Sequence, residues 1–137
     1  MVRITTAVLA AWIMSSGAAA ATPVNGRWLT DDRKAIVEIG PCGANICGRI
    51  ARLLMPMPDG QPRDEFNPDP KLRNRPIQGM IVLSGFQSDG KLWKGKIYSP
   101  EEGRTYRSTL RKNDDGTLRV QGCVAVFCKS LVWTPAR

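Results

Sequence analysis

Short runs in which polar and apolar residues alternate recur along most of the chain. In one of them Tyr106, Ser108 and Leu110 share one face, while Arg107 and Arg111 occupy the other. A period of two is typical of β-strands with one buried face, and no stretch shows a convincing helical period. Eight runs are therefore expected to be strands: residues 26–29, 34–39, 47–54, 81–83, 92–98, 105–110, 118–122 and 129–133.

Turn residues separate these runs at regular intervals. Asp-Gly pairs at residues 89–90 and 115–116 each lie between two alternating runs, which is a strong local signal for a β-hairpin. Many short strands joined by hairpins favour an all-β antiparallel sandwich or barrel. The pattern by itself does not decide between the two.

The first 21 residues have the features of a secretory signal. Arg3 precedes an apolar run at residues 7–14, and small residues at 18–21 satisfy the cleavage rule. The apolar run is too short for a membrane span. We expect residues 1–21 to be a signal peptide, residues 22–137 to fold as one domain, and the protein to be periplasmic or secreted. The alternative for the first segment is an amphipathic or buried N-terminal helix.

The four cysteines form two pairs with the same spacing. An even number of cysteines in a small exported domain favours disulfides, and three connectivities are possible. We favour Cys42–Cys47 and Cys123–Cys128, because each pair flanks a short turn. The alternative is one zinc site formed by all four cysteines, although its usual spacing is tighter and its usual compartment reducing.

A long proline-rich segment, residues 55–80, interrupts the strand pattern. Asp69 before Pro70 is typical of a helix N-cap, so one short helical turn is expected there. Segments of this length are usually functional or disordered. It is either a lid or partner surface carrying Arg73 and Arg75, or a structural plug over one end of the fold. The apolar side chains expected to anchor it are Leu72, Ile77 and Met80.

Several motifs spread over the predicted mature chain together resemble one family. They are Gly26-x-Trp28, Cys42, Cys47-Gly48-x-Ile50, the block from Asn67 to Pro76, Trp93-x-Gly95-x-Ile97-Tyr98-x-Pro100, Gly103-x-Thr105-Tyr106, Leu118-x-Val120-x-Gly122-Cys123, Cys128-x-Ser130 and Trp133-Thr134. The chain resembles the bacterial domain-of-unknown-function 2147 family. That resemblance implies an exported, lipocalin-like β-barrel. With it, the eight runs predict a single antiparallel eight-stranded barrel.

The residue types present exclude several kinds of catalysis. The chain has no histidine, which excludes Ser-His and Cys-His pairs and histidine metal sites. Residues 85–91 match the start of a phosphate-binding loop, but Leu92 stands where a hydroxyl residue is needed and the context is a hairpin. We find no catalytic constellation, and we expect a protein that is not an enzyme and has no cofactor and no metal.

Binding is therefore the predicted role. We expect a monomer that holds a small apolar molecule or an envelope component in or at the mouth of the barrel. The alternative is a surface module whose basic outer face binds anionic lipid or polysaccharide, since the net charge is +8. Nucleic acid is not expected as a partner. The sequence leaves open whether the barrel is hollow or filled. The candidate ligand-binding residues are Trp28, Trp93, Tyr106, Asn67, Asp69, Arg73 and Arg75.

Overall fold

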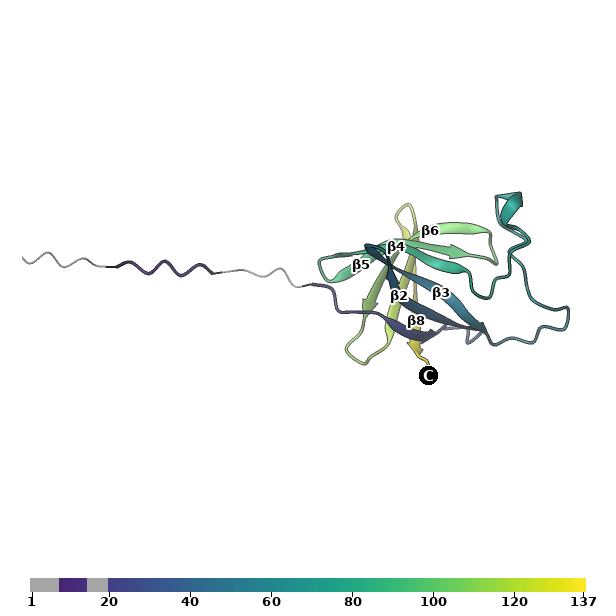
Figure 1. Ribbon diagram of the computed structural model, residues 1–137, viewed down its shortest axis with the longest axis horizontal. Coiled ribbons are helices and arrows are strands. Elements are labelled where there is room, and N and C mark those ends of the chain that lie inside the picture. Colours follow the sequence, from purple (N-terminus) through teal and green to yellow (C-terminus); the bar gives the residue numbers. More distant parts are fainter. Residues whose placement is uncertain (1–7, 15–19) are drawn as a thin grey trace, which may run out of the picture.

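The computed structural model describes residues 8–14 and 20–137, and within these residues it contains eight β-strands (Figure 1). All eight runs expected from the alternating pattern are strands, and several extend further into their hairpins. The strands are β1 Gly26–Leu29, β2 Ala35–Cys42, β3 Asn45–Leu53, β4 Ile81–Asp89, β5 Leu92–Ser99, β6 Arg104–Lys112, β7 Leu118–Val124 and β8 Phe127–Pro135.

The strands form a closed barrel in chain order. Each strand pairs antiparallel with the next, and β8 returns to β1, where Trp28 lies opposite Pro135 and Leu29 opposite Thr134. The predicted eight-stranded antiparallel barrel is thus confirmed, and a sandwich is excluded. Closure leaves no unpaired sheet edge, which removes the usual route to edge-to-edge aggregation.

The connections alternate between the two ends of the barrel. Residues 20–25 enter at the left end in Figure 1, whereas the long segment between β3 and β4 projects at the right. The turns β1–β2, β5–β6 and β7–β8 belong to the same end as that long segment, because the chain passes up and down. We call this end the mouth and the opposite one the closed end.

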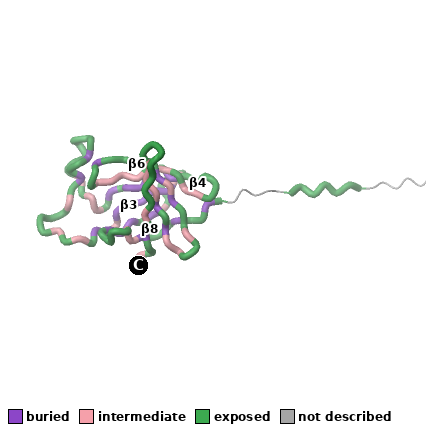
Figure 2. Tube along the Cα trace, turned by 180° about the vertical axis from the view of Figure 1, so that it is seen from behind, coloured by how far each residue is buried: buried purple, intermediate pink, exposed green. Residues whose placement is uncertain are grey.

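Large apolar side chains fill the closed end. Val24, Trp28, Phe86, Leu110 and Leu118 are all at most 4% exposed and belong to one core cluster. Figure 2 shows the buried stretches of the chain in purple. The Trp28 indole N–H donates to the Val24 carbonyl at 2.9 Å. The N-terminal segment before β1 therefore plugs this end of the barrel, as expected for a chain entering at its base.

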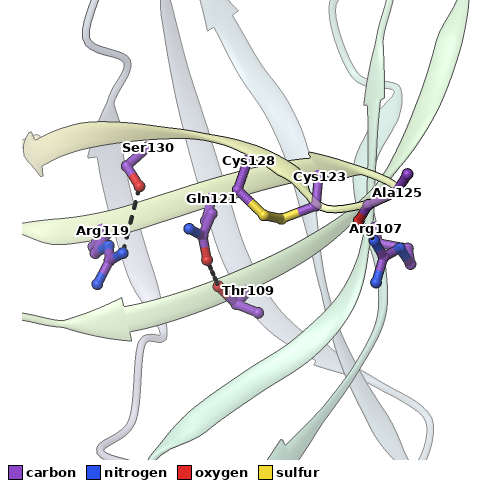
Figure 3. The surroundings of a disulfide bond; sticks show 8 residues. All are labelled: Arg107, Thr109, Arg119, Gln121, Cys123, Ala125, Cys128 and Ser130. Carbon is purple, nitrogen blue, oxygen red and sulfur yellow. Dashed lines mark hydrogen bonds between the residues drawn. A yellow bond between two sulfur atoms is a disulfide. The ribbon is translucent and has the colours of Figure 1, made fainter.

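Two disulfides close two of the hairpins. Cys42 is bonded to Cys47 across the β2–β3 turn, and Cys123 to Cys128 across the β7–β8 turn (Figure 3). This is the favoured pairing, and it leaves no free cysteine for a zinc site among the described residues. Small loops of this kind contribute about 2 kcal/mol each in the chain-entropy model.

The predicted signal segment is only partly described. Residues 1–7 and 15–19 lie outside the described residues. In the described part, the large apolar side chains of residues 8–14 are between 89% and 95% exposed. Within residues 8–14 and 20–137, no helix is long and apolar enough to cross a membrane.

Candidate ligand-binding cavity

A cavity of about 720 Å³ opens at the mouth of the barrel. Three of the connections at that end border it: the β1–β2 turn with Thr30 and Lys34, the long segment with Pro62 and Ile77, and the β5–β6 turn. Beside the fourth connection it is bordered by the strand ends Val124 and Phe127. This volume falls within the usual range for small-molecule pockets. The barrel is therefore filled at one end and hollow at the other, which the sequence left open.

The walls of the cavity are mainly apolar. They consist of inward side chains of β2 to β8, most of them β-branched residues or Leu rather than large aromatics: Val37, Ile50, Val82, Ile97, Val120, Leu131 and Trp133. Gly122 of β7 also faces the cavity, and a Cβ atom there would meet only Ile97 and Tyr106, at 3.8 and 3.9 Å. Modest side chains and this glycine leave space that larger residues would fill.

Polar groups gather at the rim of the cavity. Lys34 lies 4.0 Å from Glu101, so the β1–β2 and β5–β6 turns approach each other across the mouth. The Tyr106 hydroxyl donates to Glu102, and this hydrogen bond raises the pKa of Tyr106. Lys129 adds a cation on the side of β8. An apolar interior below a polar rim suits a molecule with an apolar body and a polar end.

The buried carboxylate of Asp64 fixes the long segment against the barrel. It accepts hydrogen bonds from Tyr98 of β5 at 2.6 Å, from the Asn67 amide at 2.8 Å and from the Arg75 guanidinium at 2.9 Å. Burial alone raises the pKa of Asp64, but the three hydrogen bonds and the Arg75 charge outweigh it, so the pKa is lowered. We call these four residues the Asp64 cluster.

The hydroxyl of Tyr98 reflects the same environment. Burial and its hydrogen bond to the Asp64 carboxylate raise the pKa of Tyr98 to about 12. Because Tyr98 also borders the cavity, the cluster joins the long segment to the cavity wall. Every donor named here has its acceptor, which is the pattern of a structural network rather than of a reactive group.

A second contact seats the same segment on the β5–β6 turn. Gly103 has φ +64°, and a Cβ atom there would lie 1.9 Å from the Phe66 carbonyl oxygen. Only glycine permits this approach. Of the three predicted anchors, Met80 is buried and Ile77 packs against the core, but Leu72 is 38% exposed and does not anchor the segment. The expected short helix is present as a 3₁₀ turn at Pro70–Leu72 with Asp69 as its N-cap.

Comparison with known proteins identifies the family of this barrel. Residues 26–135 match an uncharacterized protein family conserved in bacteria, DUF2147. The chain belongs to this family. A solved structure from Helicobacter pylori, described as a protein that belongs to the lipocalin family, has a TM-score of 0.74 and 24% identity over 85% of both chains. That likeness shows the fold. No curated protein matches the chain.

The three predicted aromatic residues lie at different levels of this DUF2147 barrel. Tyr106 borders the cavity. Trp28 belongs to the closed end, and the Trp93 indole N–H donates to the Thr22 carbonyl at 2.9 Å. Neither tryptophan borders the cavity, because both rings donate hydrogen bonds to the N-terminal segment, which enters at the closed end. As ligand-binding residues, all three remain predictions.

The four predicted residues of the long segment do not border the cavity either. Asn67 and Arg75 belong to the Asp64 cluster, Asp69 caps the 3₁₀ turn, and the Arg73 side chain donates to the Asn67 carbonyl at 2.8 Å. The segment contributes other residues to the cavity: Met55, Pro62 and Ile77. Sequence reasoning missed these and the apolar wall residues, although the same inward-facing alternation that predicted the core marked most of the wall.

Proposed function

We propose that this protein is an exported carrier that binds a small molecule, with an apolar body and a polar end, inside the barrel. The observation that carries the proposal is the cavity of about 720 Å³ with apolar walls and a polar rim. Empty apolar space of this size lowers stability unless something occupies it, because the lining side chains lose packing contacts. A ligand would replace those contacts.

The proposal includes the cellular compartment. Residues 1–21 act as a signal peptide and residues 22–137 form the mature protein in the periplasm or outside the cell. The exposed apolar side chains at residues 8–14 support removal of the leader, since so much exposed apolar surface disfavours a mature soluble segment. The two disulfides fit an oxidising compartment.

The proposal also holds that binding is not coupled to catalysis. Three pairs of polar groups at the cavity are engaged with each other: Tyr106 with Glu102, Lys34 with Glu101, and Tyr98 with Asp64. The buried indole N–H of Trp133 in the cavity wall has no partner among the residues that the structure describes, and an indole N–H is not an acid–base group near neutral pH. The chain has no histidine to act as a general base near neutral pH. A closed barrel with no free sheet edge supports a monomer.

Gly122 offers a direct test of the cavity. Gly122→Leu and Gly122→Phe place progressively larger side chains in the cavity, and the added Cβ atom meets only side-chain atoms, at ordinary contact distance. We expect the wild-type protein to bind N-phenyl-1-naphthylamine, a neutral apolar dye, with increased fluorescence. Gly122→Leu should weaken binding and Gly122→Phe should weaken it by at least about tenfold, because the side chain takes the place of the dye.

Gly40→Leu provides the matched control. A Cβ atom at Gly40 has no heavy atom within 4 Å, and Gly40 does not border the cavity. Dye binding should be unchanged in this variant. Binding that is equal in wild type and Gly122→Phe, both shown to be folded by circular dichroism, would place the dye outside the barrel and refute the proposal.

A further inference from the structure

The tip of the β7–β8 hairpin exposes apolar side chains where turns are usually polar. Val124, Ala125, Val126 and Phe127 form this tip, and Val126 and Phe127 are 87% and 79% exposed. Two-residue hairpin turns favour Asn and Gly, yet here the turn is Ala125-Val126, with φ +51° at Ala125. The tip stands clear of the barrel at the top of Figure 1 and is green in Figure 2.

The tip is held in shape rather than left loose. The Cys123–Cys128 disulfide closes the hairpin directly below it, and the Arg107 guanidinium donates to the Ala125 carbonyl oxygen (Figure 3). A fixed turn presents the Val126 and Phe127 side chains to the outside at little further entropic cost. Such a feature is suited to insertion into an apolar phase.

The strands that carry and flank the tip are basic, whereas the carboxylates of the mouth lie on the β1–β2 and β5–β6 turns: Asp31, Asp32, Glu101 and Glu102. Strands β6, β7 and β8 together contain six Lys and Arg and no Asp or Glu. Arg104, Arg107 and Lys129 lie in the part of these strands nearer the tip, whereas Arg111, Lys112 and Arg119 lie next to the β6–β7 turn at the closed end. Arg107 touches the tip itself, and Lys129 follows it by two residues. Exposed apolar side chains beside cations match the chemistry of an anionic bilayer, with acyl chains below a negatively charged headgroup layer.

The tip is also continuous with the mouth of the cavity. Val124 and Phe127 border the cavity, and Lys129 lies on the same rim. Phe66, 58% exposed, lies on the long segment at the same end, against Gly103. A bilayer that received the tip would therefore face the open mouth rather than the closed end.

We propose that the Val124–Phe127 tip inserts into an anionic lipid bilayer, with Arg104, Arg107 and Lys129 at the headgroups, and so docks the mouth of the barrel on the membrane. The apolar tip and the basic strands carry this inference. The role of docking rests on the proposed function, because it would let a membrane-borne molecule with an apolar body pass into the cavity without crossing water.

Flotation with vesicles tests the docking. The full-length gene is expressed in a bacterial host, and the exported protein is purified. One sample is mixed with vesicles of 70% phosphatidylcholine and 30% phosphatidylglycerol, and another with vesicles of pure phosphatidylcholine. We expect binding to the anionic vesicles that weakens with salt. Val126→Asp combined with Phe127→Ser should weaken it by at least about tenfold. Arg104→Gln and Lys129→Gln should each weaken it by about fivefold.

Val132→Asp is the matched control for the tip. Val132 is a half-exposed valine on β8, away from the tip, so its replacement adds the same charge without touching the docking residues. It should bind vesicles like wild type. Because wild type and all variants share the same N-terminal residues, differences in vesicle binding between them come from the barrel.

Three results would overturn the docking proposal: no binding of the wild type to anionic vesicles, equal binding of the tip variant, or equal loss in Val132→Asp. Tip-dependent dimers in sedimentation without vesicle binding would instead assign the tip to a second copy of the chain. Gly122→Phe separates the two proposals. If Gly122→Phe floats with the vesicles like wild type but wild type binds no dye, the docking proposal stands and the carrier proposal fails. If wild type binds the dye but neither protein floats with the vesicles, the carrier proposal stands and the docking proposal fails.

Discussion

At the scale of single residues, the Asp64 carboxylate has the most unusual surroundings. It is fully buried, and its partners come from positions 3, 11 and 34 residues away along the chain. A buried charge is tolerated only when it is paired and hydrogen-bonded, as it is here. The long segment therefore depends on one ionised group for its attachment to β5.

Replacement of this group should weaken the fold. Asp64→Asn removes the charge facing Arg75 and turns one acceptor into a donor facing Tyr98, so we expect a loss of about 2–3 kcal/mol in the free energy of unfolding. Urea denaturation measures it. Asp59→Asn, at an exposed position in the same segment, should change little. A loss below about 0.5 kcal/mol would show that the cluster does not hold the segment.

The same group predicts how stability depends on pH. The pKa of Asp64 is lower in the folded protein than its ordinary value of 3.8. Its stabilising contribution is therefore complete above that value and is lost as the pH falls from there through the lower folded pKa. Between about pH 5 and pH 2, wild type should lose more stability than Asp64→Asn. Parallel stability profiles over this range would contradict the assignment.

At the scale of elements, the long segment and the β5–β6 turn fit together at Gly103. Gly90 has nearly the same φ, +62° against +64°, but open space around its missing side chain. Gly103→Ala meets the Phe66 carbonyl in addition to the backbone strain that both variants share. Comparing Gly103→Ala with Gly90→Ala therefore separates the effect of the contact with the long segment from the effect of backbone strain at one residue.

This comparison gives a prediction for thermal unfolding. Gly90→Ala should cost about 1 kcal/mol, and Gly103→Ala about 2–4 kcal/mol, because the segment must move away from the turn. Dye binding should also change only in Gly103→Ala, since the segment borders the cavity. Equal melting temperatures and equal dye binding in the two variants would show that the segment does not rest on Gly103.

The elements themselves were largely predictable from sequence, whereas their contacts were not. Strand alternation is a local signal, so all eight strands and the hairpin disulfides were found. The Asp64 cluster joins residues distant in the chain, and no spacing rule connects Asp64 with Tyr98. The prediction that Leu72 anchors the segment was wrong, because Leu72 lies in the 3₁₀ turn that projects away from the barrel and its side chain is 38% exposed.

At the scale of the whole molecule, the barrel is solid at its base and hollow at its mouth. The large buried residues Phe86, Leu110 and Leu118 lie at the closed end, while the cavity walls carry mainly Val, Ile and Leu, with Trp133 and Gly122 among them. Which residues meet across the barrel depends on strand register and tilt, so the sequence alone could not decide between a hollow and a filled interior. The carrier proposal follows from the hollow mouth above the filled base.

Native mass spectrometry of the protein purified from a bacterial periplasm tests this account most directly, with Gly122→Phe prepared in parallel. We predict that wild type carries an additional non-covalent mass that denaturation releases, and that Gly122→Phe carries none. The denatured masses should also be four hydrogens below the reduced value, for two disulfides. Bare chain in both preparations, or the same additional mass in both, would contradict a ligand held within the barrel.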